Sequence, residues 1–201
     1  MPSSLSPFFN ASGVAILGAS SDPKKLSHGT VKNLLSHGYK GKVYPVNPNA
    51  SEILGIKTYP QISLVPDPVE LAVIVLPVGL ILETLEACGQ RGIKAVVIIA
   101  GGFREVGAEG AELERKSLEI IRKYGMRAVG PNCVGTMDCR TGLDTTFIGG
   151  MPVPGPIAFV SQSGAVAGGV IDLLIESKVG FSHFASLGNE MDVSESDMIE
   201  Y

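Results

Sequence analysis

Two short segments of this chain combine glycine with hydroxyl side chains, a pattern typical of phosphate-binding turns. The first segment comprises Gly18, Ala19, Ser20, Ser21, Asp22, Pro23, Lys24 and Lys25. It follows an apolar run of strand length, and a helix is expected after it. Glycine lets the backbone approach an anion closely, and the free N–H groups at the start of a helix favour negative charge. The segment therefore indicates a seat for the phosphates of a nucleotide cofactor, and a plain strand-to-helix turn is the alternative.

The second segment repeats this pattern and consists of Ser161, Gln162, Ser163 and Gly164. An apolar run precedes it and a helical pattern follows, so it predicts an anion seat at a helix N-terminus. An ordinary serine N-cap is the simpler alternative. The G-x-S-x-G turn of a hydrolase nucleophile does not fit, because position 161 is serine.

No residue of this chain has the sequence context of a catalytic group. Cys133 has no histidine close to it in the sequence, which favours a packing thiol over a nucleophile. His28, His37 and His183 have no evident carboxylate partner. The cysteines and histidines also lack the spacing of zinc ligands, so we expect no metal site.

Alternating strands and helices must position these segments. We expect strands at 14–17, 42–46, 71–76, 94–100 and 127–129, and helices at 30–37, 78–91 and 108–124. This alternation predicts an α/β fold with a parallel, doubly wound sheet. Such sheets bind ligands at the carboxyl ends of their strands. By that rule, the residues at three further strand ends also become candidates for ligand binding: Pro77, Ala100 with Gly101, and Asn132.

Residues 133–156 lose this periodicity and are rich in glycine and proline, which predicts a linker. We place a domain boundary near Pro154, with a first domain over 1–150 and a second over 151–201. The second has expected strands at 157–160 and 181–187, a helix at 165–177 and another from Ser194 that still continues at Tyr201. Two strands cannot close a core of their own, so we expect further chain or another subunit to complete this domain.

A dinucleotide such as NAD is disfavoured at the first segment. The G-x-G-x-x-G fingerprint is absent, because position 20 is serine and position 23 is proline. An acidic residue should also end the second strand to bind the ribose of NAD. That strand is followed instead by Asn47, Pro48 and Asn49.

The composition argues against several other classes of protein. The chain has 201 residues, of which 45% are hydrophobic, and a net charge of −4, so it can bury a core and lacks a basic surface for nucleic acid. Its longest apolar run, 71–82, is too short to cross a bilayer. We read no signal peptide and no disulfide framework, and we therefore expect a cytoplasmic protein.

Four stretches taken together resemble a known family. They are VAILGAS at 14–20, VYPVNP at 43–48, GPNCVG at 130–135 and VSQSG at 160–164. The set is similar to the CoA-binding α portion of the NDP-forming acyl-CoA synthetases, which include ADP-forming acetate–CoA ligases and the α subunit of succinyl-CoA synthetase. The likeness covers essentially the whole chain. It implies a Rossmann-like CoA-binding domain followed by the beginning of a flavodoxin-like domain.

The resemblance also implies roles for individual residues. The turn from Gly18 to Pro23, with Lys25, would contact the CoA phosphates, and residues 47–49 would lie near the adenosine. Pro77, Ile99, Ala100 and Gly101 would contact the pantetheine arm, and Asn132 would belong to the same cofactor site. Ser161, Gln162, Ser163 and Gly164 would receive phosphate from a phosphohistidine, which the family carries well downstream of this turn and beyond this chain.

The implied reaction of the parent enzyme joins a carboxylic acid to CoA with ATP, through an acyl phosphate, and releases ADP and phosphate. ATP and Mg²⁺ would bind to a separate ATP-grasp module, within an oligomer, and this chain alone would be inactive. Gly168 stands where succinate-type α subunits carry tyrosine, which favours the acetate type. A CoA-sensing module of a protein acetyltransferase and an NAD-dependent oxidoreductase are the alternatives.

Overall fold

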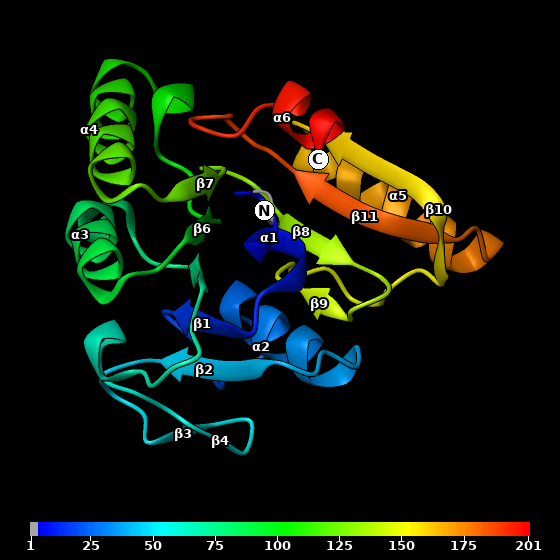
Figure 1. Cartoon of the computed structure of the whole chain (residues 1–201), viewed down its shortest axis with the longest axis horizontal. Coiled ribbons are helices and arrows are strands. Elements are labelled where there is room, and N and C mark those ends of the chain that lie inside the picture. The colour runs from blue at the N-terminus through cyan, green and yellow to red at the C-terminus, as the bar shows by residue number, and fades with distance from the viewer. Residues whose placement is uncertain (1–3) are drawn as a thin grey trace.

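A computed structural model describes residues 4–201 and contains a five-stranded parallel sheet (Figure 1). The strands lie in the order β2-β1-β5-β6-β7. Their bounds are β1 Gly13–Leu17, β2 Lys42–Val46, β5 Leu71–Ile74, β6 Ala95–Ile98 and β7 Arg127–Val129. The chain winds one way from β1 to β2 and the other way from β5 onward, so a topological switch point lies between β1 and β5. The prediction of a parallel, doubly wound sheet is confirmed.

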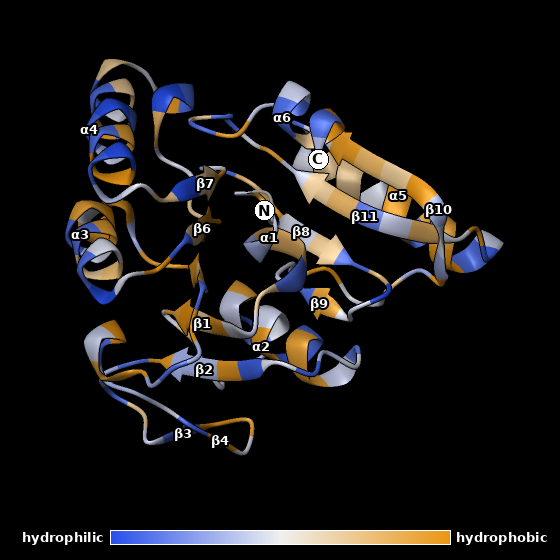
Figure 2. Ribbon diagram, in the orientation of Figure 1, coloured by the Kyte–Doolittle hydropathy of each residue, from blue (hydrophilic) through white to orange (hydrophobic). Residues whose placement is uncertain are grey.

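Both faces of this sheet are buried, which explains why its strands read as continuous apolar runs. Successive side chains of a strand point to opposite faces. Val14 and Ile16 pack with α1 (Pro7–Asn10) and α2 (Leu26–Ser36), while Ala15 and Leu17 pack with α3 (Ile81–Arg91) and α4 (Ala108–Tyr124). Figure 2 shows hydrophobic residues in the strands and many hydrophilic residues along α4. Each fully buried valine, leucine or isoleucine stabilises the fold by about 1.5–3 kcal/mol.

A second sheet lies against α1 and has the order β10-β11-β8-β9. Its strands are β8 Gly135–Asp138, β9 Leu143–Asp144, β10 Pro154–Ser161 and β11 Phe181–Ser186. Strands β10 and β11 are parallel, whereas β8 pairs antiparallel with both β11 and β9. The prediction of a linker over 133–156 is therefore wrong at β8 and β9. Both strands are short, and β8 pairs with β11, whose residues lie more than 40 positions away, which no local pattern reveals.

Helix α5 (Gly164–Ser177) covers the other face of this second sheet and forms a third core with β8 and β11. The last helix, α6 (Glu195–Glu200), begins at a capping box in which Ser194 and Asp197 satisfy each other's backbone N–H groups. The location of the domain boundary near Pro154 stays a prediction.

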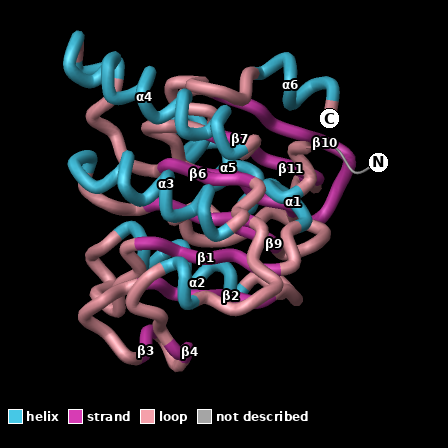
Figure 3. The backbone as a smooth tube through the Cα atoms, turned by 60° about the vertical axis from the view of Figure 1, so that its left-hand side comes forward, coloured by secondary structure: helices cyan, strands magenta, loops and turns pink. Residues whose placement is uncertain are grey.

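Several local elements differ from the expectation. Helix α2 begins at Leu26 rather than at residue 30, and a 3-10 turn at Val78–Leu80 precedes α3. The hairpin of β3 (Glu52–Ile53) and β4 (Ile56–Lys57) was not expected and lies beside β2 (Figure 3). Among residues 4–201, no helix is both long enough and apolar enough to cross a membrane.

Candidate functional site

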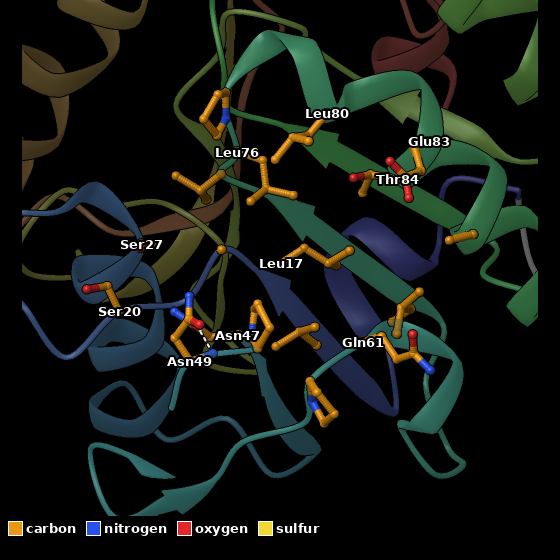
Figure 4. Close-up of a pocket in the computed structure, with 18 of the residues that line it drawn as sticks. Leu17, Ser20, Ser27, Asn47, Asn49, Gln61, Leu76, Leu80, Glu83 and Thr84 are labelled. Carbon is orange, nitrogen blue, oxygen red and sulfur yellow. Dashed lines mark hydrogen bonds between the residues drawn. The ribbon is translucent and has the colours of Figure 1, made fainter. Parts of the chain in front are cut away.

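A cavity of about 710 Å³ opens at the carboxyl ends of β1, β2 and β5, at the switch point of the sheet (Figure 4). We call it the first cavity. Its floor is apolar and includes Leu17, Val46 and Leu76. The predicted residues that line it are Gly18, Ser20, Lys25, Asn47, Pro48, Asn49 and Pro77. The sequence prediction of a ligand site at this edge therefore coincides with an actual hollow.

Gly18 shapes the turn at the end of β1. Its φ is +86°, a left-handed value that glycine adopts readily, and its N–H donates to the Val46 carbonyl oxygen over 3.0 Å. A Cβ atom added to Gly18 would lie 2.3 Å from the Val75 carbonyl oxygen. Only glycine therefore lets the turn run this close to both neighbouring strands.

Asp22 organises the loop between this turn and α2. Its backbone N–H donates to Ser20 Oγ over 3.1 Å, and its carboxylate accepts from the Lys24 N–H over 2.9 Å. The N–H groups of Lys25 and His28 donate to the carbonyl oxygens of Asp22 and Lys25, but no side chain caps α2, so the N–H groups of Leu26 and Ser27 remain available to an anion. Lys25 adds a positive charge at the wall of the first cavity.

Four predicted residues of this region do not line the first cavity. Ala19 is buried behind the turn, and Ser21 and Asp22 are exposed. Pro23 instead lines a smaller cavity of about 360 Å³ beside α2. Their predicted contacts with a cofactor stay predictions.

Asn47 holds the end of β2 against the turn. Its Nδ2 donates to the Ala19 carbonyl oxygen over 2.8 Å, and its Oδ1 accepts from the Asn49 N–H over 2.8 Å, the bond drawn in Figure 4. Both polar ends of this side chain are thus already bonded within the protein. No carboxylate stands at this strand end, where a dinucleotide fold would use one to bind ribose.

A second cavity, also of about 710 Å³, lies where residues that follow the strands of both sheets meet, after β6 and β7 on one side and after β10 and β11 on the other. It is lined by these predicted residues: Ile99, Gly101, Asn132, Gln162, Ser163 and Gly164. Leu26, at the start of α2, is part of the lining of both cavities, so the two lie next to each other. Neither Ala100 nor Ser161 belongs to the lining of this second cavity.

The turn before α5 is built by its own serines. Ser161 Oγ accepts from the Ser163 N–H over 3.1 Å, and Ser163 Oγ accepts from the Val166 N–H over 3.3 Å. Ser163 is therefore the N-cap of α5. The cap leaves other N–H groups of the first helical turn open toward the second cavity, so the N-cap and the anion seat are compatible.

The thiols and imidazoles occupy structural positions. Cys133 is buried beneath the second cavity, where burial raises the pKa of its thiol to about 12, in agreement with a packing role. The expectation that the histidines lack carboxylate partners is wrong for two of them. His37 Nδ1 lies 2.9 Å from Asp144, and His183 Nε2 lies 3.3 Å from Asp138. Both partners come from the β8–β9 segment, whose position the sequence did not reveal.

Some lining residues escaped the sequence analysis. Gln61, Glu83 and Thr84 complete the polar wall of the first cavity (Figure 4), and Asn189 lines the second. Asn189 follows the carboxyl end of β11, so the strand-end rule could have identified it. Gln61 lies in an irregular segment and carries no such signal. Within residues 4–201, no three histidine, cysteine, aspartate or glutamate side chains gather into a group able to hold a metal ion.

Comparison with known proteins identifies the two halves of the chain. Residues 12–138 match the family model of the CoA binding domain, and residues 154–201 match that of the succinyl-CoA ligase like flavodoxin domain. The α subunit of acetate–CoA ligase [ADP-forming] II of Pyrococcus furiosus is 46% identical over 96% of this chain and 42% of its own length. The 4-hydroxybutyrate–CoA ligase [ADP-forming] of Nitrosopumilus maritimus is 39% identical over 97% of this chain and 28% of its own length.

A solved structure shares this architecture. The dinucleotide forming acetyl-coenzyme A synthetase 1 of Ca. Korarchaeum cryptofilum, in complex with phosphate and ADP, superposes with a TM-score of 0.94 at 41% identity. The match covers 98% of this chain and 42% of that one. The chain thus spans less than half the length of these relatives. It belongs to the CoA-binding domain family and corresponds to the CoA-binding portion of the NDP-forming acyl-CoA synthetases.

Proposed function

We propose that this chain is the CoA-binding portion of an ADP-forming acid–CoA ligase that acts on a small carboxylic acid such as acetate. The observation that carries the proposal is a pair of adjacent cavities that share Leu26 in their linings, one beside the start of α2 and the other beside the start of α5. CoA is a long ligand with a nucleotide at one end and a thiol at the other. Two adjacent cavities suit such a ligand better than they suit a compact one.

In this proposal the nucleotide of CoA lies in the first cavity. The N–H groups at the start of α2 and the ammonium of Lys25 would bind its phosphates, because the dipole and the charge both favour anions. The apolar floor would receive the adenine. The pantetheine arm would then pass Leu26 and Gly101 into the second cavity, which brings the thiol toward α5.

The second cavity would hold the phosphate end of the reaction. CoA thiolate would attack the carbonyl carbon of an acyl phosphate and form the thioester, while phosphate leaves and takes the electron pair of the broken C–O bond. The helix N-terminus at Ser163 and Gly164 would hold that phosphate. The released phosphate would then pass to a histidine and on to ADP on an ATP-grasp module, with Mg²⁺, both outside this chain.

Exposed apolar side chains support a protein that works with a partner, and the cysteines support a location in a reducing cytoplasm. Val166 and Leu173 of α5 are 54% and 62% exposed, and Ile157 of β10 is 45% exposed, so this part of the chain exposes apolar side chains. Apolar surface of this kind is typical of a protein contact. The three cysteines are free and buried, which fits a reducing cytoplasm, where we locate the enzyme.

Calorimetric titration with CoA and, separately, with NAD tests the proposal. We expect CoA to bind and NAD to bind at least tenfold more weakly, because nothing at Asn47 can accept both ribose hydroxyls as a carboxylate would. A Lys25→Met variant should bind CoA more weakly, because it removes one positive charge near the phosphates. Lys116→Met, on the outer face of α4, should leave the CoA affinity unchanged. Tight NAD binding without CoA binding would overturn the proposal. The chain alone should form no acyl-CoA from an acid, ATP and CoA.

A further inference from the structure

The side-chain amide of Asn189 is held between two carboxylates under the second cavity. Asn189 is only 8% exposed, and its Nδ2 donates to Glu105 Oε2 over 2.6 Å and to Glu114 Oε2 over 3.0 Å. An ionised carboxylate can only accept hydrogen bonds, so these contacts identify the nitrogen of the amide and use both of its hydrogens. The oxygen of Asn189 is therefore the atom that remains for other partners.

Glu105 is kept ionised at this position. Burial by itself would raise the pKa of its carboxyl, but the Asn189 amide and the backbone N–H groups of Gly102 and Phe103 donate to it and hold that pKa below its usual value. Around neutral pH, Glu105 is therefore a carboxylate that accepts the hydrogen bond, and the Asn189 nitrogen donates it.

Asn132 is oriented by this arrangement. Its Nδ2 lies 3.5 Å from Asn189 Oδ1, so its nitrogen faces Asn189 and its own oxygen faces the other way. That oxygen lies beside Gly101, because a Cβ atom added to Gly101 would be 3.2 Å from Asn132 Oδ1. The backbone of Asn132 is also fixed, with φ of +58° and its N–H donating to the Ala100 carbonyl oxygen over 2.9 Å. Among the described residues, none donates a hydrogen bond to Asn132 Oδ1.

Gln162, across the same cavity, is exposed but is also bonded through its nitrogen. Its Nε2 donates to Glu190 Oε2 over 3.1 Å and to Glu195 Oε1 over 2.7 Å. Hydrogen bonds from Glu190 and Gln162 hold the pKa of Glu195 below its usual value, so Glu195 accepts as a carboxylate, whereas burial and Glu195 raise the pKa of Glu190. The bond to Glu195 therefore identifies the nitrogen of the Gln162 amide, and its Oε1 remains free to accept. Besides Asn189, the second cavity is therefore lined by two carboxamides, those of Asn132 and Gln162, and in both of these the oxygen is available to a ligand.

We propose that Asn132 Oδ1 and Gln162 Oε1 accept hydrogen bonds from the secondary amide N–H groups of the pantetheine arm, with Asn189 as a positioning residue for Asn132. The inference rests on the proposed function, since the donors belong to CoA. The pantetheine arm has two secondary amides, and each needs an acceptor once it leaves water. A phosphate, which only accepts at its oxygens, is repelled by both carboxamide oxygens and belongs instead at the N–H groups of α5.

The test compares CoA with adenosine 3′-phosphate 5′-diphosphate, which is CoA without its pantetheine arm, by calorimetric titration of the whole chain. Asn132→Gly removes the carboxamide and tolerates the left-handed backbone, and Gln162→Ala removes the second acceptor. Each variant should weaken CoA binding about three- to tenfold, the range of one neutral hydrogen bond, and leave the nucleotide affinity within about twofold. Gln90→Ala, which removes an exposed carboxamide on α3, should change neither affinity.

The positioning role of Asn189 predicts non-additivity. Asn189→Ala should weaken CoA binding as Asn132→Gly does, and the double variant should be no weaker than Asn132→Gly alone. If Asn189→Ala does not fold, Asn132→Gly and Gln162→Ala decide the question. Equal losses for CoA and for the nucleotide, or no loss for either, overturn this inference while the proposed function stands. A wild-type chain that binds neither ligand overturns the proposed function and this inference with it.

Discussion

Replacing Gly18 by alanine tests whether the turn after β1 requires glycine for its backbone and for its close approach to β5. The left-handed backbone at φ +86° costs an L-residue about 1–2 kcal/mol. The added Cβ would also lie 2.3 Å from the Val75 carbonyl oxygen and 2.9 Å from Leu76 Cδ2. Because the nearer atom belongs to the backbone directly after β5, relief requires the end of this strand to move. Overpacking of this kind costs about 1–3 kcal/mol.

The expected loss in the free energy of unfolding of Gly18→Ala is therefore about 2–5 kcal/mol. The two contributions can be separated by Gly55→Ala in the β3–β4 hairpin. Gly55 has a similar φ of +79°, but a Cβ atom there would meet nothing within 4 Å. This control should lose only the backbone contribution, about 1–2 kcal/mol.

Urea unfolding of both variants measures the difference directly, and calorimetry with CoA follows the function. We expect Gly18→Ala to be less stable than Gly55→Ala by at least about 1 kcal/mol and to bind CoA more weakly, since the turn moves. Gly55→Ala should bind CoA as the wild type does. Equal stability of the two variants, or an unchanged CoA affinity in Gly18→Ala, would refute the reasoning about this turn.

Three further outcomes are expected. Asn33→Ala should lower the free energy of unfolding by about 2–3 kcal/mol, because the buried carbonyl oxygens of Thr146 and Ile148 lose their donor at 3.0 and 2.8 Å; a loss below about 0.5 kcal/mol in urea unfolding would contradict this. The three cysteines should resist a thiol reagent at pH 8 in the native protein and react after denaturation, because burial raises the pKa of Cys88 and Cys133 to about 12 and of Cys139 to about 11. The hydrogen bond from the Ser194 backbone N–H lowers the pKa of Asp197 in the folded protein. The Asp197 carboxylate therefore stabilises the fold at any pH above the ordinary pKa of aspartate. This stabilisation is lost as the pH falls through the pKa of Asp197 in the folded protein. The stability difference between wild type and Asp197→Asn should accordingly shrink below about pH 4, and a difference independent of pH would argue against the role.

The sequence was informative wherever a structure depends on neighbouring residues. The apolar run at Val14 to Leu17 predicts a buried strand because both faces of β1 are covered, and β1 is observed at Gly13–Leu17. Helix α4 ends before Gly125, as the pattern predicts, since the C-cap needs the left-handed backbone that glycine provides. Gly18 likewise indicated the turn after β1, because its backbone is left-handed, with φ of +86°. The strand-end rule then indicated the edge of the sheet at which the first cavity opens.

The start of α2 shows where local patterns mislead. The polar residues around Ser27 and His28 suggest a loop, yet α2 begins at Leu26. Ser27 and Thr30 are buried against other parts of the protein, and this packing outweighs their weak helix preference. The helix start matters for the site, because it brings its free N–H groups and Leu26 to the cavities.

By itself the sequence determined the parallel sheet, the edge at which the first cavity opens and the two turns that follow β1 and β10, because strand alternation, glycine backbones and helix starts depend on residues next to each other. Only the tertiary structure decided how those parts form a site. The bond from Asn189 to Glu105 spans 84 positions, and the bond from Asn33 to Thr146 spans 113. Contacts at such separations leave no periodic signal in the chain, and they exist only once the two sheets have packed together.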